Sequence, residues 1–267
     1  MSAAEYKCRG CSYVAKRPLE QCPLCNRWAS FDLVARPQTA IGEGNARPKR
    51  LGEIDRTRVA RVPTGDSEID RFFGGGVAKG AAILFYATPG FGKSTLGLRL
   101  ATSYARPLYG VAEESDAQVT ERIERLGLYD ELEPKLGLWE TRSIEALLDG
   151  DDDLRIVDSV HAFEMKGAPG AVGSSPHTVE LVRTIVQHSK ARDVTLLLIA
   201  HVNKDGDVSG TAGLEHWVDH TIQGWVDEDG TRRFRTHKNR YGPAPIEMTA
   251  KMTDRGLSEF ACERREK

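Results

Sequence analysis

The sequence lacks any hydrophobic run long enough to cross a membrane. Its longest apolar stretches, 81–87 and 194–200, fall far short of the roughly 20 residues that a bilayer-spanning helix needs. The first residues also lack a basic cluster followed by an apolar segment, so no secretory signal is visible. These absences argue against a membrane-spanning protein and predict a cytoplasmic location.

The chain has no excess of positive charge either. Lys and Arg number 37 against 39 Asp and Glu, which argues against a polycation that binds phosphates over its whole surface. Nucleic-acid binding would therefore be local, and the Lys- and Arg-rich residues 1–62 are compatible with it. A length of 267 residues with 40% hydrophobic residues fits a soluble protein with one sizeable core and a small appended module.

Cysteine is scarce, but four of the five cysteines form two closely spaced pairs. Each pair has the spacing Cys-x2-Cys, and the four residues are Cys8, Cys11, Cys22 and Cys25. Zn²⁺ binds four such thiolates in a tetrahedron; two disulfides or four unrelated thiols are the alternatives. A four-cysteine site leaves no coordination position open. The metal is therefore expected to be structural, and its removal is expected to unfold this module.

Composition changes after the cysteines and predicts where the domains meet. Residues 36–62 are rich in Pro, Gly, Arg and Glu and have no sustained apolar periodicity, which is typical of a linker. The sequence thus predicts a zinc ribbon over 1–35, a linker over 36–62 and a larger domain over 63–267.

A glycine-rich loop opens the pattern of the larger domain. An apolar strand over 81–86 leads into the loop, and a helix follows from about Leu96, which is the context of a phosphate-binding loop rather than of a chance glycine turn. Lys93 would reach the β- and γ-phosphates of ATP, and Ser94 would ligate Mg²⁺. Alanine replaces the first glycine of the motif, at a cost if φ is positive there. The residues expected to bind nucleotide are Ala87, Thr88, Pro89, Gly90, Phe91, Gly92, Lys93, Ser94 and Thr95.

Strand and helix patterns alternate through the rest of this domain. Further apolar strands are expected at 107–112, 154–157 and 194–200, and helices at 115–126 and 178–191. Ser115 and Gln118 have the spacing of a capping box at the start of the first of these helices. The alternation predicts an α/β fold with a mostly parallel, helix-covered sheet.

Acidic residues fall where two of the strands end. Glu113 and Glu114 follow one strand and Asp158 follows another, at the edge where open α/β sheets bind their ligands. A carboxylate there can orient the water that attacks a phosphate, and Asp158 suits the outer shell of Mg²⁺. Taken alone, Asp158 fits the N-cap of a helix equally well.

Several stretches together resemble the RadA/Sms family of bacterial DNA-recombination ATPases, which have a RecA-like fold. Residues 238–242 read Lys-Asn-Arg-Tyr-Gly, close to the family's Lys-Asn-Arg-Phe-Gly, with Tyr241 in place of Phe. The likeness extends from Cys8 to Phe260. It also includes the four cysteines, the phosphate-binding loop, Glu113–Ser115 and the segments 64–76, 201–206 and 214–219.

The resemblance implies a DNA-dependent ATPase that forms hexameric rings and drives branch migration of recombination intermediates. It assigns Glu113 as the catalytic glutamate, Asp158 as the Walker B aspartate and His201 as a sensor at a strand end. Lys238 and Arg240 would reach the nucleotide of a neighbouring subunit and stabilise the charge on the transferring phosphoryl group. On spacing alone, these two cations would be interpreted as a solvated basic strand end.

DNA, single-stranded or branched, is the expected partner. The Gly-rich segments 166–175 and 203–213 are the candidate contact loops, and plain surface loops are the alternative. Their few aromatic residues and modest charge favour contact with the DNA backbone over base readout. Family members usually continue into a domain similar to that of the Lon protease, so a short form without that domain is expected.

Three functions remain in competition at this point. The favoured one is an ATP-driven DNA motor or remodelling enzyme that uses ATP, Mg²⁺ and Zn²⁺. The second is a regulatory ATP-binding protein in which nucleotide switches assembly or partner choice. The third is a zinc-ribbon adaptor with a vestigial ATPase fold, against which the intact set of Lys93, Glu113, Asp158, Lys238 and Arg240 argues.

Overall fold

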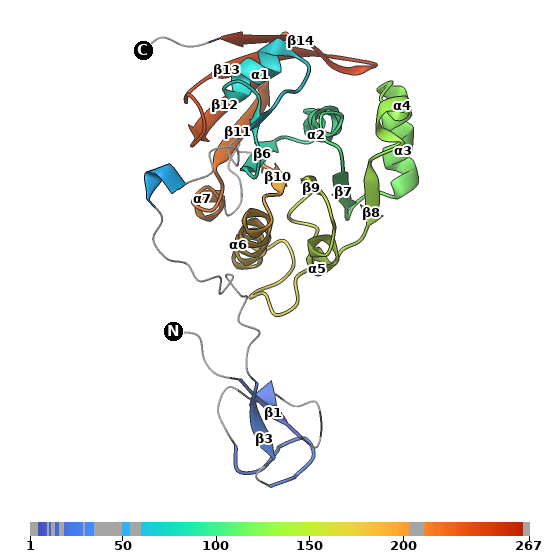
Figure 1. Ribbon diagram of the computed structural model, residues 1–267. Coiled ribbons are helices and arrows are strands. Elements are labelled where there is room, and N and C mark those ends of the chain that lie inside the picture. Colours follow the sequence, from blue (N-terminus) through green and yellow to red (C-terminus); the bar gives the residue numbers. More distant parts are fainter. Residues whose placement is uncertain are drawn as a thin grey trace. The chain divides into compact units, whose positions relative to one another are not determined.

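The chain divides into two compact units, residues 1–50 and residues 51–267 (Figure 1). The computed structural model describes residues 5–9, 11, 14–15, 19–28, 30–34, 50–53, 60–202 and 211–263. Most of the predicted linker, 36–62, lies outside the described residues. Its last two residues form strand β4 (Arg61–Val62), which pairs with β5 (Val77–Ala78). The predicted domain boundaries therefore stay a prediction.

The N-terminal unit contains a small antiparallel sheet. Its strands lie in the order β2 (Val14–Ala15), β1 (Glu5–Cys8) and β3 (Phe31–Val34). Few side chains are buried in the described part of this unit, namely Cys8, Ala15, Cys22 and Ser30. A unit as short as residues 1–50 buries little apolar surface when it folds, which is the situation in which a structural metal is used.

The second unit is built on a nine-stranded sheet. All neighbouring strands from β11 to β8 are parallel, and β12 to β14 continue the sheet as an antiparallel ladder. This confirms the predicted mostly parallel sheet. The strand order is β14 (Gly256–Glu263), β13 (Glu247–Thr253), β12 (Arg232–Asn239), β11 (His220–Val226), β6 (Ala82–Ala87), β10 (Thr195–His201), β9 (Leu154–Asp158), β7 (Pro107–Val111) and β8 (Gly137–Glu140).

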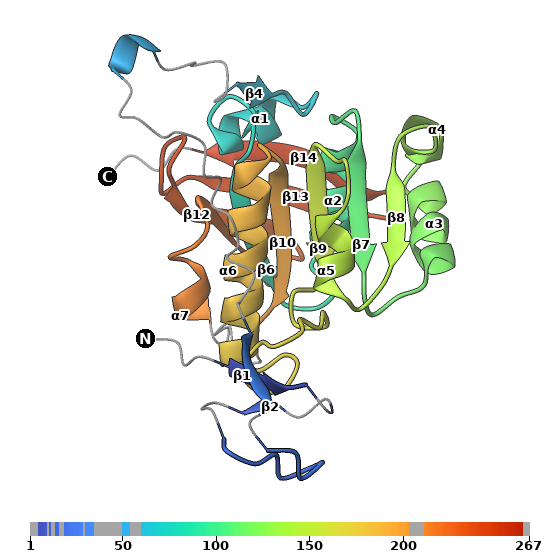
Figure 2. The ribbon, with the colours of Figure 1, turned by 60° about the horizontal axis from the view of Figure 1, so that its bottom comes forward.

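Helices cover both faces of this sheet (Figures 1 and 2). One apolar cluster joins the sheet to α1 (Ser67–Phe73), α2 (Lys93–Ala101) and α3 (Asp116–Arg125), with α4 (Tyr129–Leu132) beside them. The other joins it to α5 (Ile144–Leu148), α6 (Ser175–Ala191) and α7 (Thr211–Leu214). A short 3₁₀ helix, η1 (Leu51–Glu53), lies at the start of the unit. No helix in the described part of the chain is long and apolar enough to cross a bilayer.

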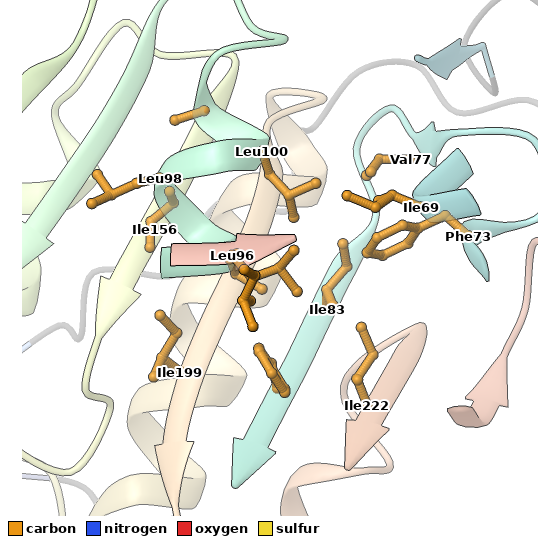
Figure 3. Packing of buried hydrophobic residues seen from close by; sticks show 14 of the residues in the cluster. Ile69, Phe73, Val77, Ile83, Leu96, Leu98, Leu100, Ile156, Ile199 and Ile222 are labelled. Atoms are coloured by element: carbon orange, nitrogen blue, oxygen red, sulfur yellow. The ribbon is translucent and has the colours of Figure 1, made fainter. Parts of the chain in front are cut away.

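Strand β6 shows why the central strands are apolar throughout. Ile83, Phe85 and Ala87 belong to the cluster under α1 and α2, whereas Leu84 and Tyr86 belong to the cluster under α6. Successive side chains of a strand point to opposite faces, so a strand covered on both faces needs apolar residues at every position. Figure 3 shows Ile83 among side chains of α1, α2 and the neighbouring strands.

The predicted elements occur close to their expected positions. The strands expected at 81–86, 107–112, 154–157 and 194–200 are β6, β7, β9 and β10. The capping box of α3 is present, with Gln118 N–H donating to Ser115 Oγ at 3.3 Å. The helix after the glycine loop begins at Lys93, before the predicted Leu96, with Gly92 as its N-cap in a left-handed conformation that glycine adopts readily.

Candidate functional site

A cavity of about 350 Å³ opens at the carboxyl ends of β6, β7, β9 and β10. Parallel strands bring the residues that follow them to one edge of the sheet, so groups distant in sequence meet there. The lining includes residues that the sequence singled out, among them Glu113, Asp158 and His201. The full set is Pro89, Gly90, Gly92, Lys93, Ser94, Thr95, Val111, Glu113, Glu114, Arg122, Arg125, Asp158, His201 and Met252.

Lys93 spans the glycine loop at the bottom of this cavity. Its side chain is buried, and Nζ donates to the carbonyl oxygens of Ala87 at 2.9 Å and Thr88 at 3.1 Å. Burial lowers the pKa of Lys93 to about 8, although the nearby Asp158 and Glu113 carboxylates oppose that shift. The amine is thus a poorly solvated cation at the start of a helix, suited to bind an anion.

The loop conformation depends on glycine at two positions. Gly90 has φ +75° and Gly92 has φ +109°, in the left-handed region that favours glycine. Among the described non-glycine residues, positive φ is confined to Asn26, Asp193 and Glu259, so Ala87 carries no such strain. Alanine is therefore tolerated where the motif usually has its first glycine.

The loop is anchored to the core through Phe91. This side chain is fully buried, and its ring lies edge-on to Phe85 at 5.8 Å and to Phe234 at 4.9 Å between centroids. A Cβ atom on Gly224 of β11 would lie 2.6 Å from the Phe91 ring and 3.0 Å from the Ala87 Cβ. Phe91 does not line the cavity, and neither do Ala87 and Thr88. The Phe91 side chain thus holds the loop in place and does not face the cavity.

Asp158, at the end of β9, accepts hydrogen bonds from two hydroxyl groups. Its Oδ2 accepts a hydrogen bond from Ser94 Oγ at 2.6 Å and from the Tyr109 hydroxyl at 2.5 Å. Turns and not a helix follow β9, so Asp158 is not a helix N-cap. Burial and the charge of Asp158 raise the pKa of Tyr109 far above its usual value. A serine hydroxyl bonded to a carboxylate fits the chemistry of Mg²⁺, which prefers oxygen ligands.

The two adjacent glutamates have different surroundings. Both carboxylate oxygens of Glu114 accept from Arg122, at 2.5 and 2.7 Å. Glu113 is about half exposed, and its nearest contacts are long, at 3.5 Å to Ser159 Oγ and 3.7 Å to His201 Nε2. Glu114 is therefore held by an ion pair, whereas Glu113 is available to a water molecule in the cavity.

Lys238 and Arg240 lie away from the cavity. Lys238 Nζ donates to the carbonyl oxygens of Glu215 at 2.6 Å and Val218 at 2.7 Å, and Arg240 pairs with Asp219 at 3.2 Å. Asp219 also accepts from the backbone N–H of Ala82, the first residue of β6. These cations thus lie toward the amino edge of the parallel strands, and the structure does not bring them to the Lys93 cavity of the same chain.

The four cysteines of the N-terminal unit converge. Their sulfur atoms all lie within 4.8 Å of one another, with 3.6 Å between Cys8 and Cys25 and 3.6 Å between Cys11 and Cys22. A tetrahedral zinc ion with bonds of about 2.3 Å requires sulfur separations of about 3.8 Å. A disulfide would need about 2.05 Å. The described geometry therefore fits Zn²⁺ and not a pair of disulfides.

Comparison with known proteins places this site in context. No family model matches the chain. A protein named DNA repair protein RadA from Mycobacterium tuberculosis H37Rv is 33% identical over 258 residues, which cover 90% of this chain and 53% of that protein. RadA from Escherichia coli K12 is 33% identical over 278 residues, covering 96% and 59%. The chain is a homologue of RadA. It spans between half and three fifths of the length of these RadA proteins.

A solved structure confirms the fold class. The crystal structure of a KaiC-like protein from Pyrococcus horikoshii OT3 has a TM-score of 0.60 and covers 74% of this chain and 98% of that protein. Its sequence identity is 16%, so this likeness concerns the fold, which is RecA-like as predicted.

Some residues of the cavity were not predicted from the sequence. Arg122 and Arg125 lie one helical turn apart on α3, and that spacing next to the two glutamates was an available signal. Met252 gave no such signal, and neither did Tyr109, which does not line the cavity but bonds to Asp158. Their positions depend on the pairing of β7 with β9 and on the β13–β14 hairpin.

Proposed function

We propose that this chain is a DNA-dependent ATPase that acts in recombination and repair as a member of a ring. The observation that carries this proposal is that Lys93, Ser94, Glu113 and Asp158 line the same cavity at the carboxyl edge of a RecA-like sheet. Homology to DNA repair protein RadA supports DNA as the substrate on which the hydrolytic energy is used.

The glycine loop is the proposed binding site for the phosphates of ATP. The backbone N–H groups from Gly90 to Thr95 lie at the N-terminus of α2, where unsatisfied donors and the helix dipole favour anions. Lys93 would exchange its two carbonyl contacts for phosphate oxygens. Ser94 and Asp158 would hold Mg²⁺, which when bound neutralises part of the charge on those oxygens.

Glu113 is the proposed group that orients the attacking water. Its carboxylate has only the two long contacts to Ser159 and His201, so it can accept a hydrogen bond from water without first breaking an ion pair. Glu114 would have to leave Arg122 to do the same. The contact of His201 with Glu113 also suits the sensor role that the family resemblance assigns to this histidine.

Lys238 and Arg240 are proposed to act on the nucleotide of a neighbouring copy. Strand β6 separates Ala82, beside their edge, from Ala87 at the glycine loop, a distance of roughly 16 Å for a strand of this length. Asp219 is held by Lys190 at 2.8 Å as well as by Arg240. Arg240 can therefore leave Asp219 for a phosphate, because Lys190 still pairs with the buried carboxylate. This supports a ring in which one copy completes the site of the next.

Contact with DNA is proposed for the loops that follow β9 and β10. Residues 166–175 are mostly exposed, and residues 203–210 of the second loop lie outside the described part of the chain. Both loops follow strands that end at the cavity, with Asp158 or His201 as the last residue. Contact of DNA with either loop would therefore shift the position of that residue. Sequence-independent contact with the phosphate backbone suits their composition.

Steady-state ATP hydrolysis by the zinc-loaded protein tests this proposal. The rate is measured with and without single-stranded and branched DNA, across a protein-concentration series, beside Lys93→Ala and the exposed control Lys79→Ala. Stimulation by DNA that rises cooperatively with protein and is lost only in Lys93→Ala is expected. Tight ATP binding without stimulated turnover would favour the regulatory alternative, and no ATP binding at all would favour the adaptor.

A further inference from the structure

Tyr109 has an unusual position for a residue of the apolar core. It lies in the middle of β7, is fully shielded from solvent, and belongs to the cluster that contains Leu96 and Ile156. Its hydroxyl nevertheless donates to Oδ2 of Asp158, a residue that lines the cavity, at 2.5 Å. Core packing alone needs only the aromatic ring, because a phenylalanine fills nearly the same volume.

The Tyr109 hydroxyl shares its acceptor with the serine of the glycine loop. Ser94 Oγ donates to the same Asp158 Oδ2 at 2.6 Å, so two neutral donors converge on one carboxylate oxygen. Hydrogen bonds of this kind, between a hydroxyl and a charged acceptor, are short and among the stronger ones in proteins. Together they restrict rotation of the Asp158 carboxylate and leave Oδ1 as the oxygen that can accept from a metal-bound water.

We propose that Tyr109 is a positioning residue for Mg²⁺, acting through Asp158. Tyr109 approaches the carboxylate from β7, on the strand beside β9, while Ser94 approaches it from the start of α2. The carboxylate is thereby held between a rigid strand and the glycine loop before any metal arrives. Such preorganisation lowers the cost of ordering the site when Mg²⁺ and nucleotide bind. This inference rests on the proposed function, since it concerns the metal that accompanies ATP.

A Mg²⁺ titration of nucleotide binding tests the role of Tyr109. Binding of a fluorescent ATP analogue is followed at increasing Mg²⁺ for the wild type, for Tyr109→Phe and for the control Tyr104→Phe. Tyr104 is a second buried tyrosine of the same apolar cluster, and the hydrogen bond to Asp158 is made by Tyr109. Melting temperatures of all three proteins report any general loss of stability.

Tyr109→Phe is expected to raise the Mg²⁺ concentration for half-maximal binding by about tenfold or more, as loss of a charge-assisted hydrogen bond predicts. Affinity for the analogue in excess EDTA should stay within about twofold of the wild type. In an Asp158→Asn background the Tyr109→Phe substitution should have no further effect on the Mg²⁺ requirement, because the carboxylate through which Tyr109 acts is absent.

Three results would overturn the inference. An unchanged Mg²⁺ requirement in Tyr109→Phe refutes it while leaving the proposed function intact. An equal shift in Tyr104→Phe would show that the effect comes from weakened packing. If the wild type itself binds nucleotide with no dependence on Mg²⁺, both the inference and the proposed metal-assisted hydrolysis fail.

Discussion

Charged side chains have different partners at the carboxyl edge and at the amino edge of the parallel strands. At the carboxyl edge, Glu113 faces a cavity with only long contacts, and Lys93 is a buried cation whose partners are carbonyl oxygens. At the amino edge, Asp219 is 1% exposed and is bonded to Lys190, Arg240 and the Ala82 backbone. The Glu113 carboxylate at the carboxyl edge therefore keeps bonding capacity for a ligand, whereas the buried Asp219 carboxylate at the amino edge is fully engaged within the chain.

Helix orientation accounts for part of this difference. In a parallel sheet the connecting helices start near the carboxyl edge, so α2 presents its N-terminal donors to the cavity. The same helices end near the amino edge, where the C-terminal turn of α6 carries His188 and Lys190. Cations are favoured at such helix ends, and anionic ligands at the beginnings. The cations Lys238 and Arg240 at the amino edge do not reach the cavity of their own chain.

The largest effect is expected from removing Lys238 and Arg240, which are proposed to act on a neighbouring copy. The double substitution Lys238→Ala with Arg240→Ala should lower DNA-stimulated turnover about 10³-fold or more, as loss of a cation supplied by a neighbour does. It should leave ATP binding nearly unchanged, because the cavity of its own chain is intact.

Mixing experiments separate a neighbour's contribution from a local one. The double variant and Lys93→Ala are each expected to be inactive alone, whereas mixtures should recover activity at mixed interfaces. Lys79→Ala, an exposed cation just before β6, should behave like the wild type. Mixtures that stay inactive while ATP binding persists would contradict a site shared between copies. Lys238 and Arg240 would then have to act within their own chain.

Within the carboxyl edge, the two glutamates should differ sharply. Glu113→Gln should lower turnover about 10²- to 10⁴-fold, the range for loss of a general base, with ATP affinity within about twofold of the wild type. Glu114→Gln should reduce turnover much less, since this carboxylate is engaged by Arg122. Turnover and binding are measured on both variants. The reverse ranking would move the water-activating role to Glu114.

A smaller effect is expected from pH. Because the pKa of Lys93 is about 8 in the nucleotide-free protein, phosphate binding favours its charged form. ATP affinity should therefore be highest below pH 8. Above it, affinity should weaken by up to about tenfold per pH unit. Dissociation constants between pH 7 and 9.5 report this slope, and Lys93→Arg, which stays charged, should flatten it. A flat wild-type profile would show that Lys93 does not bind phosphate.

The smallest effect on either edge is expected from zinc removal. Chelation should unfold the ribbon, because so short a unit cannot bury enough apolar surface to fold without its metal. ATP binding without DNA should remain within about twofold of the holo-protein. Hydrogen exchange of residues 5–34 and nucleotide titration report the two responses separately. Persistent protection of the ribbon after complete metal loss would refute the structural role of zinc.

Much of the site was accessible from the sequence because its parts are local patterns. The strand–glycine loop–helix order placed Lys93 and Ser94, and the ends of neighbouring strands placed Glu113 and Asp158. The rule that parallel strands share a carboxyl edge then predicted that these groups meet. The edge occupied by Lys238 and Arg240 was not accessible in this way, since it depends on the antiparallel pairing of β12 with β11.

Local spacing was enough to predict the four-cysteine cluster, the glycine loop between a strand and a helix, and the alternation that makes a parallel α/β sheet. In each case the interacting residues are near neighbours in the chain or repeat with the period of one element. Only the folded chain decided that Phe91 is anchored against Phe234, that Tyr109 reaches Asp158 and that Arg122 neutralises Glu114 and not Glu113. Those contacts join different elements or depend on side-chain direction, and both are determined by how the strands and helices pack.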